Sequence, residues 1–432
     1  MILEFFNKKS IKSAAIGSLI VKFLSALSAF LIGLLLARDL GLKSFGVYTV
    51  AFTTVLVLSV PVSLGLPTLI TRYVSKYEVE NNYSAIKGLL IRANQIVIII
   101  SLLVFAIAAV SYLLWWKNYD KELVDAIIYS FLLLPLIALG SLRAAALRGL
   151  KYIVLGQLPD TFLRNFIFLI LLITFQLTEQ NLTPALAIQI HIIAAFLAFI
   201  VGVYFLYIKL GRKTNMINAI YFNKHWLNQA LPFSLNSGIQ VLKNKLSTYV
   251  LVIFGSLESV ALFDVATRGA SLVAFTLDAL NTAIAPYISS EFEKNNMVSL
   301  QSIVTKTSRI IFFFALPVVI IFMVGGEKLI DFLFGKEYNK AYLPLVILCF
   351  GQLINAATGS VGLVLNMTGR QAYFTKIAVY MAVLNTLLCI PFVIWFDVKG
   401  AALLTALIII SQNIILVKYV FKDLKINTTI IK

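Results

Sequence analysis

Long apolar runs recur along this sequence of 432 residues, separated by short polar breaks. A helix needs about 20 mostly apolar residues to cross about 30 Å of hydrocarbon. Hydrophobic residues make up 60% of the chain, which excludes an ordinary soluble domain. The sequence therefore predicts an all-α polytopic membrane protein with twelve transmembrane helices. We place them at 13–37, 46–70, 89–114, 125–148, 153–177, 184–208, 232–254, 260–288, 308–331, 341–366, 372–396 and 400–421.

The formal net charge of +17 follows the predicted topology. Lys and Arg are concentrated in alternate connections, as the positive-inside rule requires of cytoplasmic segments. This pattern puts both termini in the cytoplasm. Because it explains most of the excess charge, we expect no nucleic-acid partner.

A weak internal repeat divides the helices into two groups of six. At an offset of 215, residues 42–51 (LKSFGVYTVA) align with residues 257–266 (LESVALFDVA). We therefore expect six-helix bundles at 1–208 and 231–432, joined by a cytoplasmic linker at 209–230. Bundles with an even number of helices are related by a pseudo-twofold axis along the membrane normal, as in alternating-access transporters. Duplication for structure alone is the alternative.

Five basic residues are left after those of the connections and span ends are counted, and all five lie within predicted spans, where a charge costs several kcal/mol. They are Lys22, Arg164, Lys243, Lys245 and Arg268. At 100° per residue, Lys243 belongs to a polar stripe of the helix at 232–254 that includes Asn236 and Gln240, whereas Lys245 lies about 200° round the helix. Lys243 is thus the better candidate for a cavity, and Lys245 could brace a neighbouring helix. The structural alternative for Lys22 and Arg164 is that they extend to the cytoplasmic interface.

Carboxylates accompany some of these cations. On one face of the helix at 260–288, Asp264 and Arg268 stand at i,i+4, the spacing of a helical ion pair. The same face carries Asp278, which has no obvious partner on its own helix. Asp160 and Arg164 repeat the i,i+4 spacing in the helix at 153–177. A purely structural latch is the alternative for Asp264 and Arg268.

Cations that face a cavity select an anion, and phosphate or diphosphate groups fit lysine and arginine best. The two cysteines, Cys349 and Cys389, lie in separate spans without CxxC spacing. We therefore predict no metal, no cofactor and no catalytic residue.

Residues 36–77 (LARDLGLKSFGVYTVAFTTVLVLSVPVSLGLPTLITRYVSKY) resemble the first two helices of a known group of transporters. The group is the polysaccharide-transporter branch of the multidrug/oligosaccharidyl-lipid/polysaccharide exporter superfamily. The turn at 147–151 (LRGLK) and residues 397–407 (DVKGAALLTAL) are similar to that branch as well. The likeness in helix number and spacing extends over essentially the whole chain.

This resemblance implies a flippase of the bacterial inner membrane. The substrate would be an undecaprenyl-diphosphate-linked oligosaccharide of O-antigen or capsule type. Lys22, Lys243 and Arg268 match the basic cavity of the family, with Lys245, Arg164, Asn236 and Gln240 as further substrate-binding candidates. Asp278 and Asp264 are candidates for coupling to H⁺ or Na⁺. Membrane lipid and the polysaccharide polymerase machinery are the implied partners.

Three other functions remain as alternatives. A drug or small-metabolite antiporter and a lipid-II-type flippase would share the fold. A membrane enzyme of polysaccharide assembly, a polymerase or ligase, would be expected to carry a sizeable external loop with acidic or histidine residues. The first external connection has only about eight residues (RDLGLKSF), so we expect a transporter and not an enzyme.

Overall fold

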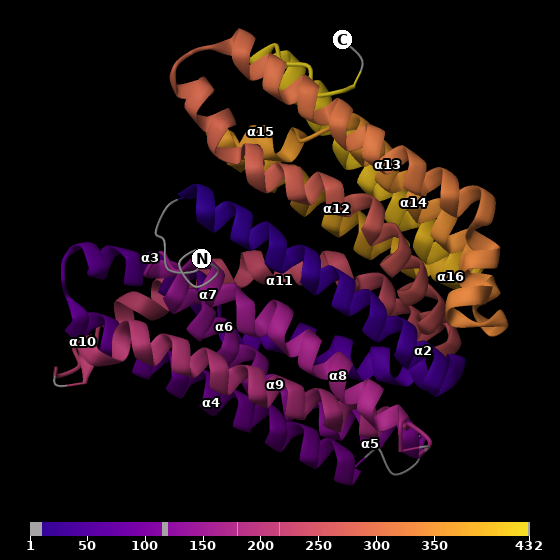
Figure 1. Ribbon diagram of the computed structural model, residues 1–432, viewed down its shortest axis with the longest axis horizontal. Coiled ribbons are helices and arrows are strands. Elements are labelled where there is room, and N and C mark those ends of the chain that lie inside the picture. The colour runs from indigo at the N-terminus through magenta and orange to yellow at the C-terminus, as the bar shows by residue number, and fades with distance from the viewer. Residues whose placement is uncertain (1–10, 115–119, 179, 216, 431–432) are drawn as a thin grey trace. The chain divides into compact units, whose positions relative to one another are not determined.

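A computed structural model describes residues 11–114, 120–178, 180–215 and 217–430, and in that part of the chain every regular element is a helix (Figure 1). The side chains of residues 11–15, 235, 236, 240, 242–244, 283 and 286 lie outside the description. The chain forms two compact units, residues 1–245 and 246–432.

Unit 1 contains the elements from α2 to the first part of α11. Their bounds are α2 Ile11–Ser63, α3 Leu66–Val79, α4 Tyr83–Leu114, α5 Lys121–Ser130, α6 Leu133–Gly149, α7 Ile153–Leu158, the π-helical turn η2 Pro159–Leu163, α8 Arg164–Gln176, α9 Pro184–Leu206, the π-helical turn η3 Tyr207–Gly211, α10 Arg212–Thr214 and α11 Asn223–Phe254.

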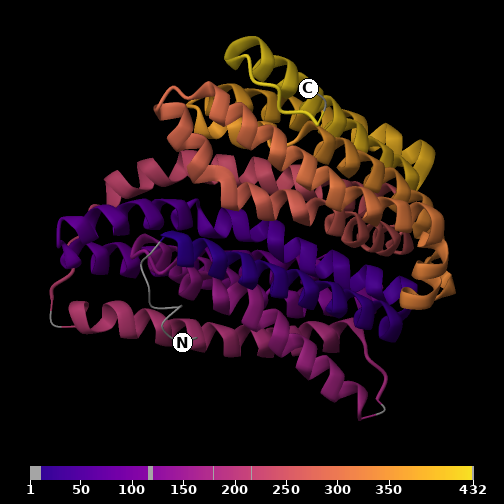
Figure 2. The same cartoon turned by 45° about the horizontal axis from the view of Figure 1, so that its top comes forward.

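Unit 2 contains the last part of α11 and the elements that follow (Figure 2). Their bounds are α12 Leu257–Glu293, α13 Met297–Phe334, the 3₁₀ turn η4 Lys336–Ala341, α14 Tyr342–Thr358, α15 Val361–Met367 and α16 Gln371–Leu424.

The prediction of twelve transmembrane helices is confirmed, with changes at several ends. Nine helices in the described residues are long and apolar enough to cross a membrane. Two of these, α2 and α16, are each a pair of helices, because Gly41 and Asp397 have non-helical backbone angles. These helices supply eleven spans. The twelfth span is α11, whose apolar part Lys245–Phe254 is shorter than the others.

Two predicted helices are broken where the sequence suggested continuity. The second predicted span stops at Ser63, because Leu64 and Gly65 have positive φ, and α3 then continues to Val79. The predicted span at 341–366 ends at Thr358 and resumes in α15 after Gly359, whose φ is +71°.

Helix α9 packs against α2, α5, α6 and α8 of unit 1. Small residues line this contact. They include Ala194, Ala195 and Ala198 of α9, all buried. In a membrane, small side chains allow helix backbones to approach closely and gain dispersion contacts. The close approach of α6 and α9 brings the charged groups described below together.

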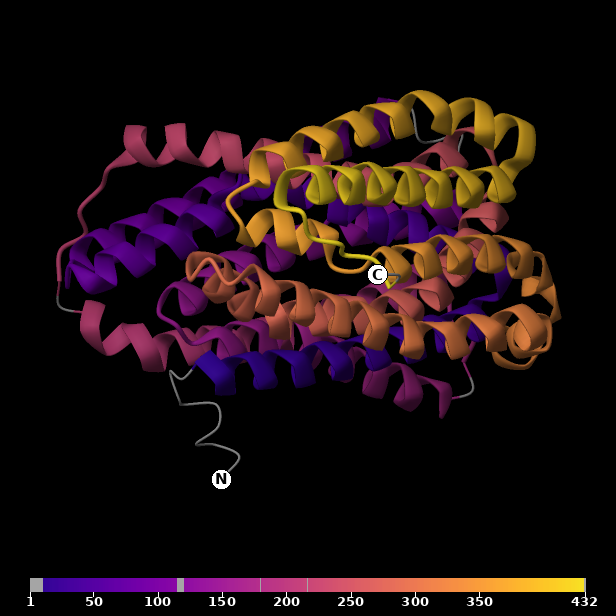
Figure 3. The ribbon, with the colours of Figure 1, turned by 90° about the horizontal axis from the view of Figure 1, so that it is seen from above.

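In unit 2, α14 packs against α12, α13 and α16. The segment after α16 returns along α13 and α15 (Figure 3). Gln301 exchanges two hydrogen bonds with the backbone of Asn427, and Ser308 Oγ donates to the carbonyl of Thr428 at 2.8 Å. Thr428 is fully buried. The C-terminal segment is therefore part of the packed unit.

The serines that the repeat aligns, Ser44 and Ser259, are placed alike in their units. Each lies close to the start of a helix and donates a hydrogen bond to a carboxylate: Ser44 to Glu122 at 2.7 Å and Ser259 to Asp397 at 2.6 Å. Beside Ser44, Lys43 Nζ donates to Asp120 at 2.8 Å and holds the pKa of that carboxyl below its usual range.

The units meet in sequence between Lys245 and Leu246, inside α11. The start of α11 packs on α3, since Trp226 Nε1 donates to the Tyr77 hydroxyl and His225 Nε2 lies 2.6 Å from the Tyr73 hydroxyl. The division into bundles at 209–230 stays a prediction.

We expect Gly65→Ala to destabilise unit 1. Gly65 has a φ of +68°, and a Cβ there would lie 2.5 Å from the carbonyl oxygen of Ala230 and 2.4 Å from the amide nitrogen of Ser234. The left-handed conformation alone costs a residue with a side chain about 1–2 kcal/mol. Thermal unfolding of the purified protein in detergent should show a lower Tm.

Gly325→Ala is the matched control, because a Cβ there meets nothing within 4 Å. In the interior of a helix, alanine is more favourable than glycine by about 1 kcal/mol, so this variant should be at least as stable as the native protein. A Gly65→Ala protein with the same Tm as the Gly325→Ala protein would contradict the close packing of Gly65.

Candidate functional site

A buried ion pair joins two parts of unit 1. Arg143 of α6 is 3% exposed, and its Nη2 lies 2.6 Å from Asp160 Oδ2 in the turn η2. The same guanidinium donates from Nη1 to the carbonyl of Phe199 in α9 at 3.1 Å and lies over the Phe199 ring. A buried charge is tolerated when an opposite charge and hydrogen bonds accompany it, and this arginine has both.

Two glycines make room for the pair. A Cβ at Gly202 of α9 would lie 1.6 Å from Arg143 Nη1, and a Cβ at Gly140 of α6 would lie 2.7 Å from Asp160 Oδ1. Any larger residue at Gly202 would occupy the space of the guanidinium. The positions of the two charges are thus set by the absence of side chains on the neighbouring helices.

The carboxylate belongs to a π-helical turn. Proline has no N–H and its ring displaces the preceding turn of a helix, and η2 begins at Pro159. The Arg164 N–H bonds to the Pro159 carbonyl, five residues back. This wider turn changes the rotation between Asp160 and Arg164, and Asp160 makes its close ion pair with Arg143. The i,i+4 pairing of Asp160 with Arg164 predicted from spacing is therefore replaced by a pairing between helices.

Polar side chains of the first half of α2 contact this turn and its flanks. Ser18 Oγ donates to Gln157 Oε1 at 2.7 Å, and Ser25 Oγ donates to the Thr161 carbonyl at 2.9 Å. Lys22 lies between the two serines on the same helix face, since residues three or four apart are neighbours. Its side chain is exposed. The structure thus places Lys22 on the face of α2 that meets η2.

Arg164 and His191 extend the polar group into the bundle. Arg164 Nε is buried without a hydrogen-bond partner among the described residues, and the arginine lies within electrostatic range of Asp160, Tyr48 and His191. His191 is 3% exposed, and its Nδ1 lies 3.1 Å from the Tyr48 hydroxyl. Arg148 also lies within electrostatic range of Asp160, so three arginines share this carboxylate, which leaves the region with a positive charge.

In unit 2, the charges lie on the less buried face of α12. The side chains of Thr267, Ser271 and Asp278 are exposed, whereas the opposite face is buried in unit 2. The buried face consists mainly of Val260, Ala261, Val265, Ala266, Ala270, Val273 and Leu277. Helical phasing predicted this separation of polar and apolar faces.

Asp264 and Arg268 form the predicted ion pair on α12. Arg268 Nε lies 2.5 Å from Asp264 Oδ2, and the two side chains are 24% and 18% exposed. An i,i+4 pair that is only partly exposed is screened less than a surface pair. Spacing within one continuous α-helix was sufficient to predict this contact.

Helix α11 carries the remaining candidates. The backbone at Asn236, Gln240 and Lys243 is helical, and their side chains lie outside the described part. Lys245 is partly exposed. The roles of these four residues stay predictions.

The polar groups of unit 1 can bind an anion through arginine and lysine, and a carboxylate can carry a proton or a cation. In the described residues, no group of three His, Cys, Asp or Glu side chains could hold a metal ion. Arg143 was not among the five cations selected from the sequence. It lies close to Arg148 and Lys151 near the end of a predicted span, where the sequence resembles a basic connection. Its position inside the apolar run 125–148 was the signal that could have identified it.

Comparisons with known proteins give one family. A family model described as "Polysaccharide biosynthesis protein" matches residues 12–292. The chain is 26% identical over 190 residues to a capsular polysaccharide biosynthesis protein, CapF, of Staphylococcus aureus, which covers 44% of this chain and 45% of that protein. It is 22% identical over 158 residues to a probable low-salt glycan biosynthesis flippase, Agl15, of Haloferax volcanii. This match covers 37% of this chain and 34% of that protein. The matches thus span less than half the length of either relative.

Solved structures show the fold. An inward-facing multidrug resistance MATE family transporter of the MOP superfamily has a TM-score of 0.74 at 16% identity, covering 94% of this chain and 97% of that chain. A MOP superfamily transporter from Pyrococcus furiosus, whose binding pocket is described as reversed in polarity, has a TM-score of 0.64 at 15% identity and covers 96% of both chains. Likeness at this level of identity establishes a shared architecture.

We expect Arg143→Met to destabilise the protein by about 2–3 kcal/mol, because it leaves the Asp160 carboxylate without its close ion partner. The loss is at the lower end for buried pairs because Asp160 is 29% exposed. The double variant Arg143→Met/Asp160→Asn removes both charges and should recover part of the loss. Thermal unfolding in detergent measures both effects.

Lys76→Met is the control for loss of a cation. Lys76 pairs with Glu80 at 3.8 Å, and the side chains are 60% and 46% exposed, so this pair is worth about 1 kcal/mol or less. A double variant no more stable than Arg143→Met would show that the charges of Arg143 and Asp160 are not coupled.

Proposed function

Because the chain belongs to the polysaccharide biosynthesis protein family, we propose that it is a flippase for lipid-linked oligosaccharides. The substrate we propose is an undecaprenyl-diphosphate-linked repeat unit of O-antigen or capsule type. It moves from the cytoplasmic to the outer leaflet of the bacterial inner membrane, and both termini of the protein lie in the cytoplasm. The fold, that of MOP superfamily transporters, supports transport and not catalysis.

The observation that carries this proposal is the excess of cations at membrane depth. In the described part of unit 1, Arg143, Arg164 and Lys22 lie within spans. The Asp160 carboxylate pairs with Arg143 and lies within electrostatic range of Arg164. Charged residues within a membrane span are costly and mark transport pathways. A diphosphate is a strong hydrogen-bond acceptor that arginine and lysine bind well.

Binding of the diphosphate uses the cations predicted from the sequence: Lys22, Lys243 and Arg268, with Lys245 and Arg164 as secondary contacts. Asn236 and Gln240 offer hydrogen bonds to sugars. The lipid tail stays in the membrane while the headgroup is transferred by alternating access. With the cell interior negative, outward movement of an anion is favoured by about 2.3 kcal/mol per charge per 100 mV.

Release from a basic site requires that the site be weakened. Inward movement of H⁺ or Na⁺ at Asp264 or Asp278 could supply this step. Both carboxylates lie on the polar face of α12, and the Asp278 side chain is exposed. A carboxylate can gain or lose a proton, or bind a cation, during each transport cycle.

Deletion in the native host tests the proposal. We expect loss of surface polysaccharide, with the lipid-linked intermediate retained on the cytoplasmic side. The two quantities are measured separately, by surface polymer assay and by accessibility of the intermediate to an external glycan-modifying reagent. Unchanged surface polymer together with increased sensitivity to drugs would instead indicate an antiporter.

Substitution of Lys243 tests the proposed cation. Lys243→Ala should abolish complementation of the deletion, and Lys243→Arg should retain part of it, because arginine preserves the charge. Lys399→Ala, which removes an exposed lysine from unit 2, is the control and should complement fully. Full complementation by Lys243→Ala would show that this cation is not used.

Asp278→Asn tests ion coupling. The variant should transport at a rate that no longer responds to collapse of the proton gradient or replacement of Na⁺, because an amide does not exchange a proton and is a poorer cation ligand. Transport is followed in proteoliposomes under imposed gradients. If the variant keeps the ion dependence of the native protein, Asp278 has no part in coupling.

A further inference from the structure

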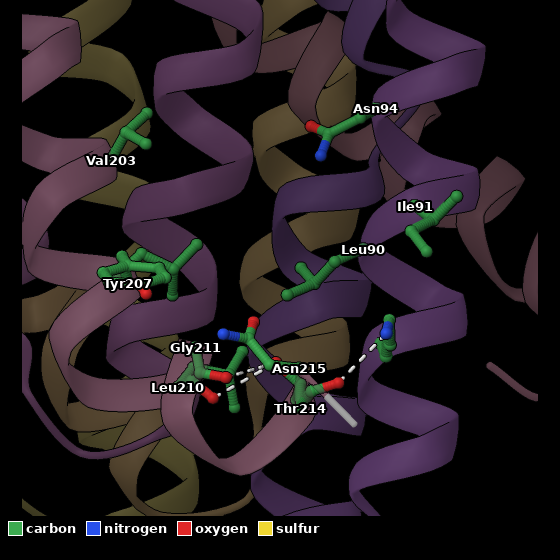
Figure 4. Close-up of a pocket in the computed structure, with 11 residues that line it drawn as sticks. Leu90, Ile91, Asn94, Val203, Tyr207, Leu210, Gly211, Thr214 and Asn215 are labelled. Atoms are coloured by element: carbon green, nitrogen blue, oxygen red, sulfur yellow. Dashed lines mark hydrogen bonds between the residues drawn. The ribbon is translucent and has the colours of Figure 1, made fainter. Parts of the chain in front are cut away.

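A groove of about 300 Å³ lies within unit 1 between α4 and the end of α9 (Figure 4). One side is lined by Leu90 and Ile91 of α4 and the other by Val203, Leu206 and Tyr207. Val203 is 44% exposed and Tyr207 is 55% exposed, although both are apolar or aromatic. Exposed apolar and aromatic side chains on a membrane-spanning helix are suited to contact with acyl chains. The groove is therefore open to acyl chains.

The π-helical turn η3 shapes one wall of the groove. Tyr207, Leu210 and Gly211 belong to this turn and line the cavity. A Cβ at Gly211 would lie 2.6 Å from the Tyr207 ring, so a larger residue would displace that ring. Single π-helical turns inside α-helices are rare and occur frequently at functional sites.

A lysine lies at the polar end of the groove. Lys87 Nζ donates to the carbonyls of Thr214 and Ile217, each at 3.0 Å, which fixes the ammonium where α4 begins and α10 ends. An ammonium has three donor hydrogens, and these bonds use two. Thr214 and Asn215 complete the polar lining.

Further cations surround this end of the bundle. Lys213 is exposed, and its Nζ bonds to the Tyr83 hydroxyl at 3.0 Å. Arg212 is exposed, and Lys209 lies over the Tyr152 ring. Glu78 is the acidic residue within electrostatic range of Lys213. The local charge is therefore positive beside an apolar groove, at the end of unit 1 that the positive-inside rule assigns to the cytoplasm.

We propose that this groove binds an anionic phospholipid, with one acyl chain against Val203 and Tyr207 and the headgroup phosphate beside Lys87 and Lys213. The combination of an apolar groove open to lipid and a cluster of cations at its end matches an acyl chain joined to an anionic headgroup. Basic pockets between transmembrane helices on the cytoplasmic side are a general mode of lipid recognition. This site goes beyond the proposed transport function and does not depend on it.

Native mass spectrometry of the full chain tests the proposal. The purified protein is equilibrated with equal amounts of phosphatidylglycerol and phosphatidylcholine of the same acyl chains, and retained lipid is counted. We expect phosphatidylglycerol to be retained at least fivefold over phosphatidylcholine. Equal retention of the two lipids by the native protein would overturn the proposal.

A substitution that fills the groove provides the second arm. Val203→Trp should reduce the preference for phosphatidylglycerol at least fivefold, because the indole occupies the place of the acyl chain. Val110→Trp places the same side chain at an exposed position near the other end of α4 and should leave the preference unchanged. An unchanged preference in Val203→Trp would also overturn the proposal.

The charge is tested without disturbing the bonds of Lys87. Lys213→Gln should lower the retention of phosphatidylglycerol at least threefold, whereas Lys121→Gln, an exposed lysine at the start of α5, should not. Equal effects of the two variants would show that charge at the groove has no role.

Competition with undecaprenyl diphosphate distinguishes a lipid site from a part of the transport route. If Val203→Trp loses the phosphatidylglycerol preference and still supports surface polysaccharide, the lipid site stands. If undecaprenyl diphosphate displaces phosphatidylglycerol and Val203→Trp abolishes surface polysaccharide, the groove holds the substrate tail and the proposal fails, while the proposed function is retained.

Discussion

The ion pair of Arg143 and Asp160 joins α6 to the turn η2 inside unit 1. Neither charge could stay in hydrocarbon alone, so α6 and η2 are held together at the height of the pair, and α9 supplies the Phe199 carbonyl. Gly140 and Gly202 are needed in the same place, because side chains there would collide with the charged groups. One electrostatic requirement thus accounts for two glycines and for the contact of three elements.

The units place their charges differently, although the sequence repeat relates them. Unit 1 buries an arginine and has a second one close by, whereas unit 2 holds Asp264 and Arg268 on the less buried face of α12. The aligned serines Ser44 and Ser259 both bond to carboxylates, so a structural feature of the repeat is kept while the charges are not.

The sequence predicted those features that depend on periodicity within one helix. The twelve spans, the polar face of α12 and the pair Asp264–Arg268 all follow from the regular rotation of an α-helix. The partner of Asp160 could not be predicted in this way, because it lies on another helix and the π-helical turn alters the local rotation. The breaks at Leu64–Gly65 and Gly359 were missed because their apolar surroundings resemble a continuous span. Which helix faces meet is a property of the packed chain.

The turn η2 bears on how related chains should be aligned. A π-helical turn uses one residue more than an α-helical turn to cover the same stretch of axis. Removing a residue between Pro159 and Leu163 would therefore convert the wide turn into an ordinary α-helical turn and leave the residues after it, including the buried Phe168 and Leu172, on the same helix face. A gap of one position at this point between two family members would mark the loss of the wide turn, with the helix itself retained. Such a gap would separate members that can form the Arg143–Asp160 pair from members that have another use for this region.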